Sequence, residues 1–386
     1  MNLQEFLNAY RAFGKAEWEN VVEGANKDLS LFDETLYALA AESEKRTPVI
    51  KRALVEHHPE VARYRRRIED FEGYPKDDML TLSRAMRTDV MKLMELRNMA
   101  AQNLGYHDYK DLDCEQSRIH EETIKDRLQE VVETHASKAE ALIEKHKMTW
   151  ESWFQDLREL TAFEEALNPQ DIVEKVVETF GFTKLRDVLS IHQDEQGIAG
   201  FARKFSDRDI RIAGRIIDNA SDLKTFIHEL SHAILYAYNT PKTLDDFLLP
   251  ANDEFLANLL ETVIAKKVCT QTQKWMIQKV DTLEMIRMSL SGLFELDLWN
   301  KVKTPEERFV HHYERLMPIK HPEYWSLDSF RSVDPLFIQY YPLGRLAGKN
   351  MLVIIDQEGL EGTELGDWLY DHLINRATEI ELASFL

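Results

Sequence analysis

The chain is poor in the residues that break helices and in the residues that cross-link chains. Its 386 residues include 14 glycines, 11 prolines and two cysteines. Cys114 and Cys269 lie far apart in the sequence. We therefore expect no disulfide framework, and we expect a reducing, cytoplasmic location. The N-terminus lacks a basic stretch followed by an apolar one, so we expect no secretory signal.

Long apolar runs and an excess of basic charge are also lacking. No run reaches the ~18 apolar residues that span a bilayer, so we expect no membrane insertion. The net charge is 48 − 68 = −20, which argues against a nucleic-acid partner because no basic surface dominates. The hydrophobic share of 44% is enough for a folded core and excludes wholesale disorder. The sequence does not indicate the oligomeric state.

Residues that favour helices fill long windows of the sequence. A stripe of apolar residues at three- and four-residue spacing predicts a long helix up to Leu104, with Asp77 and Asp78 as its caps. Asn168-Pro169 is expected to open another helix that Gly181 ends. The predicted helices lie at about 2–24, 28–45, 78–104, 120–146, 148–166, 169–181, 221–239, 251–275, 276–294, 304–317 and 340–356, with shorter ones after Pro48 and Pro59.

Residues 188–217 depart from the helical pattern. The alternation in Ile210-Arg211-Ile212 predicts a strand, and a polar turn precedes it, so we expect a β-hairpin or small sheet. The predicted fold class is mainly α. A chain of this length exceeds one hydrophobic core, and we expect a single functional unit, 1–386, with a helical lobe at 1–187 and a catalytic lobe at 188–386.

The strongest chemical signal is a His-Glu-x-x-His motif inside a predicted apolar helix. His228 and His232 share one helix face, so both imidazoles can reach one Zn²⁺ ion. Glu229 lies about 100° around the helix from His228. It can take a proton from the attacking water without binding the metal, as a general base must. Three such groups inside an apolar helix would be costly without partners.

A catalytic zinc site needs a third protein ligand. Glu254 follows His232 on a second predicted helix, across a turn-rich connection, and it would complete a site of two histidines and one glutamate. Asp253 and Glu261 are competing candidates. Glu261 shares a face with Glu254 and could instead orient a ligand histidine, and Asn258 could do the same.

Several sequence blocks resemble the thimet oligopeptidase / oligoendopeptidase F family of zinc peptidases. The blocks lie at 96–109, 219–229 and 254–261 in the order that the family has. The resemblance supports Glu254 as third ligand. It supports Glu261 as a residue that orients a ligand without binding the metal itself. Three residues depart from the family pattern, and the chain is short for a member; the departures are Ser231, Ala257 and Leu260.

The resemblance also implies residues for the transition state and the substrate. Residues 334–344 are similar to a segment whose tyrosine hydroxyls stabilise the oxyanion, which makes Tyr340 and Tyr341 candidates and favours Tyr341. The hairpin would supply the strand that binds an extended peptide through its main chain, at Gly200, Phe201 and Ala202. Its basic residues could hold a peptide carboxylate or keep the strand edge soluble.

Together these features predict a zinc metalloendopeptidase with one Zn²⁺ per chain. The resemblance implies oligopeptide substrates, cut in a groove between two helical lobes. Two alternatives stay open: a zinc metallocarboxypeptidase that trims peptide C-termini, and a helical peptide-binding relative without activity. The intact Glu229 argues against the second alternative.

Overall fold

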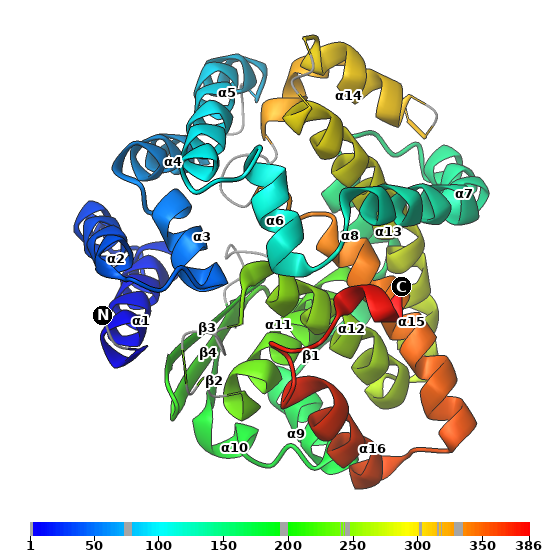
Figure 1. Cartoon of the computed structure of the whole chain (residues 1–386). Helices are drawn as coiled ribbons and strands as arrows, with labels where there is room; N and C mark the ends of the chain where they lie inside the picture. Colours follow the sequence, from blue (N-terminus) through cyan, green and yellow to red (C-terminus); the bar gives the residue numbers. More distant parts are fainter. Residues whose placement is uncertain are drawn as a thin grey trace. The chain divides into compact units, whose positions relative to one another are not determined.

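The structure is a computed structural model with two compact units (Figure 1). It describes residues 3–72, 79–193, 200–239, 241, 243, 248–300, 303–314, 316–317, 319–327 and 335–386. The expected helix caps Asp77 and Asp78, and Asp334 of the tyrosine segment, lie outside the described residues. The mainly α fold class with a small β element is confirmed. Among the helices that the structure describes, none has the length and apolar composition needed to cross a bilayer.

The first unit comprises described residues of Ser30–Ser152 and Met285–Gln339 and is helical. Glu56 is a half-buried link between its helices, because its carboxylate accepts hydrogen bonds from Arg97 Nη2 at 2.7 Å and from the Tyr109 hydroxyl at 2.6 Å. The helices of this unit are α2 (Ser30–Glu42), α3 (Pro48–Glu56), α4 (Pro59–Glu72), α5 (Met79–Asn103), α6 (Tyr109–Ser117), α7 (Glu121–His146), the 3₁₀ helix Pro322–Leu327, α14 (Pro305–Tyr313) and the second half of α13 (Gln271–Trp299).

The second unit comprises Leu3–Leu29, Trp153–Glu284 and Tyr340–Leu386. It contains every candidate site residue. Its helices are α1 (Leu3–Val21), α8 (Trp153–Leu160), α9 (Pro169–Phe180), α10 (Leu185–Val188), α11 (Ala220–Tyr238), α12 (Pro250–Val268), the first half of α13, α15 (Tyr340–Glu358), α16 (Gly362–Leu369), a π-helical turn at Tyr370–Ile374 and a 3₁₀ turn at Leu382–Phe385.

Two small sheets belong to the second unit. Strands β2 (Leu189–Gln193), β4 (Asp209–Gly214) and β3 (Gly200–Ser206) form one sheet in that order, with β3 antiparallel and β2 parallel to β4. Its β3 strand contacts α11 and α1. Phe201 turns to α1, where it stacks on Trp18 with ring centroids 5.9 Å apart. Strands β1 (Ala162–Leu167) and β5 (Ile217–Asn219) form the second sheet.

Several expectations need correction. The helix predicted at 148–166 ends at Leu160, and residues 162–167 form β1, because pairing with β5 outweighs the helical propensity of this segment. Helix α6 was not predicted; the Asp108 side chain caps it by accepting from the Asp111 backbone N–H. The break predicted at residues 275/276 lies at Cys269–Thr270 instead. The units also differ from the lobes 1–187 and 188–386, since each unit combines segments distant in sequence.

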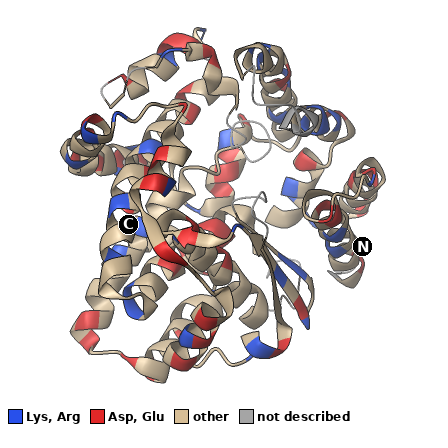
Figure 2. Cartoon of the chain, turned by 180° about the vertical axis from the view of Figure 1, so that it is seen from behind, with Lys and Arg blue, Asp and Glu red and all other residues tan. Residues whose placement is uncertain are grey.

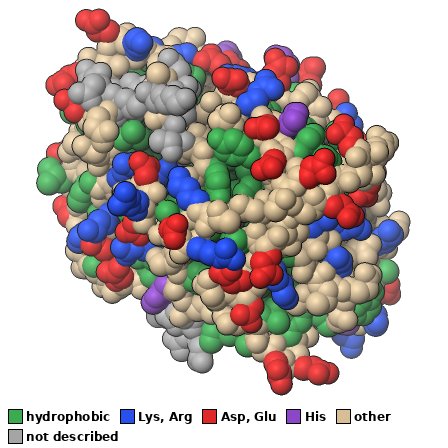
Figure 3. All heavy atoms as spheres, turned by 90° about the horizontal axis from the view of Figure 1, so that it is seen from below, with side chains coloured by type: hydrophobic (Ala, Val, Ile, Leu, Met, Phe, Trp, Pro, Cys, Tyr) green, Lys and Arg blue, Asp and Glu red, His purple; other side chains and the backbone are tan. Residues whose placement is uncertain are grey.

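Of the two forms expected for residues 188–217, a β-hairpin or a small sheet, the structure has the small sheet. The hairpin itself is present as β3 and β4. The parallel partner β2 joins it from a segment of five residues, too short for a periodic signal in the sequence. Lys and Arg recur along these strands (Figure 2), on β3 as Arg203 and Lys204 and on β4 as Arg211. On the face shown in Figure 3, acidic and basic side chains are interspersed.

Helices α12 and α15 approach each other closely because two glycines of α15 face α12. A Cβ atom on Gly344 would collide with the backbone oxygen of Phe255 and lie 2.7 Å from Cβ of Asn258. A Cβ atom on Gly348 would lie 2.6 Å from Cβ of Thr262. Since α12 carries Glu254 and Glu261, this contact fixes the helix that faces the two histidines.

Replacing Gly344 by Ala is therefore expected to force α12 and α15 apart. We expect G344A to lower the free energy of unfolding by about 1–3 kcal/mol, measured by denaturant titration. The matched control is V353A on the same helix, where the side chain is 55% exposed and the cost should stay within about 0.5 kcal/mol. Equal stability of G344A and V353A would contradict the close packing of these helices.

Candidate metal centre

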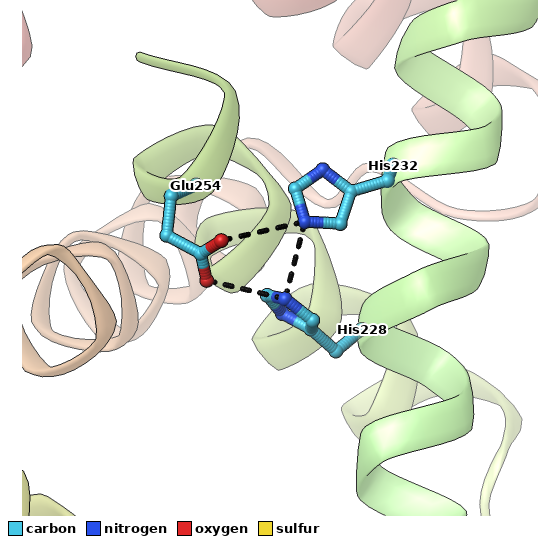
Figure 4. A group of neighbouring side chains, drawn as sticks. All are labelled: His228, His232 and Glu254. Carbon is cyan, nitrogen blue, oxygen red and sulfur yellow. Dashed lines mark hydrogen bonds and ion pairs between the residues drawn. The ribbon is translucent and has the colours of Figure 1, made fainter. Parts of the chain in front are cut away.

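The His-Glu-x-x-His motif lies on α11, whose start is fixed by a side-chain cap. The Asn219 side chain accepts a hydrogen bond from the Asp222 backbone N–H at 2.9 Å, so the helix begins directly after β5. Two turns later His228 and His232 point to the same side, toward Glu254 of α12 (Figure 4). All three side chains are buried.

The three side chains meet with their ligand atoms at nearly equal separations. Nε2 of His228 lies 3.2 Å from Nε2 of His232 and 3.1 Å from Oε1 of Glu254, and Nε2 of His232 lies 3.5 Å from Oε2 of Glu254. Atoms bound at about 2.0–2.1 Å to a tetrahedral zinc ion are roughly 3.3–3.4 Å apart. The two contacts to Glu254 use different oxygens of its carboxylate, and each distance is close to that between two ligand atoms of one ion. We call these three side chains the triangle.

The partners of the two rings explain why these nitrogens point at one another. Nδ1 of His232 donates to Oδ1 of Asp253 at 2.9 Å, and Nδ1 of His228 faces Oε2 of Glu261 at 3.4 Å. Carboxylates at Nδ1 favour the tautomer with its proton there, so each neutral imidazole would direct its Nε2 lone pair into the triangle. Burial lowers the pKa of both imidazoles, but the neighbouring carboxylates raise it, to about 9 for His228, so in the metal-free chain each Nε2 carries a proton directed at Glu254. A metal ion that binds here would replace these protons. The donor set thus fits a divalent metal ion.

A group of buried charges lies behind His228. Nζ of Lys224 lies 2.8 Å from Oε1 of Glu261, 3.1 Å from Asp281 and 3.3 Å from Glu284. Nη1 of Arg345 contacts Glu284 at 3.0 Å. Burial alone would raise the pKa of the Glu261 carboxyl, but the charges of Lys224 and Arg345 lower it to about 2. Glu261 is therefore held as a carboxylate against the ring of His228.

Asn258 supports the carboxylate ligand and not a histidine. Its Nδ2 donates to Oε1 of Glu254 at 2.7 Å, so the amide fixes the rotamer of that carboxylate. Burial would raise the pKa of Glu254, but the charge of His228 and hydrogen bonds from both histidines hold it below its ordinary value. Asp253, a competing ligand candidate in the sequence, contacts the outer nitrogen of His232 and the Tyr236 hydroxyl.

Glu229 lies beside the triangle and against the first residue of β3. A Cβ atom on Gly200 would lie 2.7 Å from Oε1 of Glu229, so only glycine lets the strand pass this close to the carboxylate. Burial raises the pKa of Glu229, against the charges of the two histidines. Among the described strands, β3 pairs only with β4 and thus has a free edge that begins at Glu229.

The two candidate tyrosines differ in their surroundings. The ring of Tyr341 stacks on that of His228, with centroids 5.5 Å apart and planes at 22°. Tyr340 is fully buried. The arrangement brings Tyr341 to the metal triangle, as the glycine register of the resemblance favours. Two arginines of the hairpin are paired within the second unit, Arg203 with Glu17 at 2.8 Å and Arg211 with Asp209 at 2.9 Å.

Lys224, Arg345 and Tyr236 were not singled out in the sequence. Lys224 precedes His228 by four residues, and Tyr236 follows His232 by four, so both share the face of the metal-binding helix. A lysine on a face that carries two histidines is a usable signal. Arg345 gives no comparable signal, because its partner Glu284 is distant in sequence.

Comparisons with known proteins add the fold. No family model matches the chain, and no curated protein sequence matches it. Among solved structures, a carboxypeptidase from Pyrococcus furiosus has 15% identity and a TM-score of 0.57, over 99% of this chain and 94% of that chain. The chain shares the fold of this carboxypeptidase and of the two peptidase structures that follow. A protein assigned as an oligoendopeptidase F from Bacillus anthracis has 11% identity and a TM-score of 0.54, over 99% and 79% of the chains. PZ peptidase A has 12% identity and a TM-score of 0.53, over 98% and 82%.

The peptidase fold and the triangle together predict different outcomes for the two neighbouring acids of α12. We expect E254A to weaken zinc binding by more than about 100-fold, because a ligand is lost. We expect D253N to weaken it only about 10- to 100-fold, because Asp253 orients His232. Competition with a chelator measures both affinities. Full zinc affinity in E254A would show that Glu254 is not the third ligand.

Proposed function

We propose that the protein is a zinc metallopeptidase that hydrolyses peptide bonds of short oligopeptides. The observation that carries the proposal is the buried triangle of His228, His232 and Glu254 with Glu229 beside it, at the start of a free strand edge. A zinc ion held by these three residues would activate water and polarise the peptide carbonyl. The peptidase fold supports this reading.

The residues of the chain have distinct tasks in such a reaction. The edge of β3 at Gly200, Phe201 and Ala202 binds an extended peptide through main-chain hydrogen bonds, which tolerate many sequences. Glu229 takes the proton of the attacking water and delivers it to the leaving amine. Its pKa is raised by burial, which brings its proton affinity closer to that task.

The remaining groups stabilise the charge of the oxyanion and orient the two histidines. The hydroxyl of Tyr341 donates to the oxyanion that forms at the attacked carbonyl carbon, from its position against His228. Asp253 and Glu261 keep the two imidazoles in one tautomer throughout.

Both cysteines are free thiols, in keeping with the cytoplasmic location that we propose.

A carboxypeptidase is the second candidate. The observation that favours it is the similarity to the Pyrococcus furiosus carboxypeptidase, which this chain covers over 94% of its length. Mass spectrometry of products from a mixed peptide library separates the two: internal cuts indicate an endopeptidase, and stepwise loss of C-terminal residues indicates a carboxypeptidase.

Loss of the base should slow turnover strongly without loss of the metal. We expect E229Q to keep one zinc per chain and to cleave a mixed peptide library about 10²- to 10⁴-fold more slowly than the wild type. Zinc content and initial rates are the two measurements. Zinc binding with no cleavage by the wild type would refute the proposed peptidase activity.

The tyrosines provide a matched pair of substitutions. We expect Y341F to lower kcat about 10²- to 10³-fold with little change in KM, because the lost hydroxyl acts only in the transition state. Y340F should keep kcat, since it leaves Tyr341 and its contact with His228 in place. The reverse result would identify Tyr340, and not Tyr341, as the donor to the oxyanion.

A further inference from the structure

A pocket of about 140 Å³ lies in the second unit on the free side of β3. Residues of β3 line it but residues of β4 do not, and β4 occupies the other side of β3 in the sheet. The pocket therefore opens where a peptide bound to the strand edge would lie. Its other walls come from α1, from the end of α11 and its following loop, and from the start of α12.

The interior of the pocket suits an uncharged group. Leu7, Phe13 and Leu248 supply half-buried apolar walls. The charged side chains in the lining are already paired. Arg203 contacts Glu17 at 2.8 Å, and Nζ of Lys204 donates to the Tyr236 carbonyl at 2.8 Å. Asp253 accepts from His232 and Tyr236. A charged ligand would have to break these contacts, whereas an apolar one leaves them intact.

The place of the pocket along β3 sets which substrate residue can reach it. Gly200 lies against Glu229, and Lys204 lines the pocket. Four residues of strand span about 13 Å. A peptide paired with β3 would therefore put the residue three or four positions from its scissile bond at the pocket.

We propose that this pocket selects peptides with a large apolar side chain, foremost an aromatic ring, three or four residues from the scissile bond. A cavity of about 150 Å³ lined by apolar side chains takes up benzene, so the pocket has the size for a phenyl ring. The assignment rests on the proposed peptidase function and names its substrate class.

Gly14 offers a way to fill the pocket from inside the fold. It lies within α1 and lines the pocket, and a Cβ atom there would meet Cδ of Arg203 at an ordinary 3.7 Å. A leucine at this position can extend into the space without moving the backbone. The matched control is A12L, an exposed position of the same helix that does not line the pocket.

The experiment uses zinc-loaded protein and alanine-based decapeptides in which one phenylalanine is moved through every position, with cuts located by mass spectrometry. We expect the wild type and A12L to show a kcat/KM roughly 10- to 100-fold higher when phenylalanine lies three or four residues from the cut. G14L should lose this preference and keep the rate for the all-alanine peptide. Equal preference in G14L and A12L, or no preference in the wild type, would overturn the pocket assignment.

A binding measurement separates failure of the pocket from failure of the proposed function. Calorimetry with E229Q compares the peptide that carries phenylalanine with the all-alanine peptide, with and without G14L. Tighter binding of the phenylalanine peptide that G14L abolishes would support the pocket even if the wild type cleaved nothing. Equal binding of both peptides would overturn the pocket, whatever the cleavage result.

Discussion

The ion pair between Lys224 and Glu261 is the contact on which the candidate site depends. Glu261 is 1% exposed and Lys224 is 2% exposed, and removing either charge would leave the other buried without its closest counter-charge. The pair joins α11 to α12, and its neighbours Glu284 and Arg345 bring in α13 and α15. The position of His228 relative to Glu254 is thus coupled to buried ion pairs that join four helices.

This cluster also has a net charge that suits a cation. Lys224 and Arg345 supply two positive charges, and Glu261, Asp281 and Glu284 supply three negative ones, so the five sum to 2 − 3 = −1. Glu254, Glu229 and Asp253 add further acid on the near side of the histidines. The basic side chains Lys224 and Arg345 therefore lie behind the ligands. There they stabilise the Glu261 carboxylate and do not occupy the place of a metal ion.

Much of the fold could be predicted from the sequence, because helical periodicity and caps are local signals. The helix opened by Asn168 and ended by Gly181 lies where the pattern places it, since cap and positive φ act within one turn. Strand β1 was missed because its pairing with β5 depends on residues distant in sequence. Strand β2 lies within residues 188–217, where a β-hairpin or small sheet was expected, but its parallel pairing with β4 has no local signal. The division of the chain into two units, each made of segments distant in sequence, was missed for the same reason.

The inner part of the candidate site was predictable and the outer part was not. The spacing of His228 and His232 fixes a shared helix face. The need for a third ligand left Glu254, Asp253 and Glu261 as candidates, among which the family resemblance supports Glu254. The contact of Tyr341 with His228 depends on how α15 packs, which spacing alone cannot give. Asn258 was expected beside a histidine but donates to Glu254, because side chains four residues apart on one helix meet first.

The ligand atoms of the three side chains already lie 3.1–3.5 Å apart in the described fold, and this spacing has a consequence for stability. Folding brings two imidazoles against a carboxylate, which keeps them protonated in the metal-free chain. An ion that binds there needs little rearrangement and displaces these protons, so its binding free energy adds to the stability of the fold and depends on pH. Availability of the metal would then govern how long the chain stays folded.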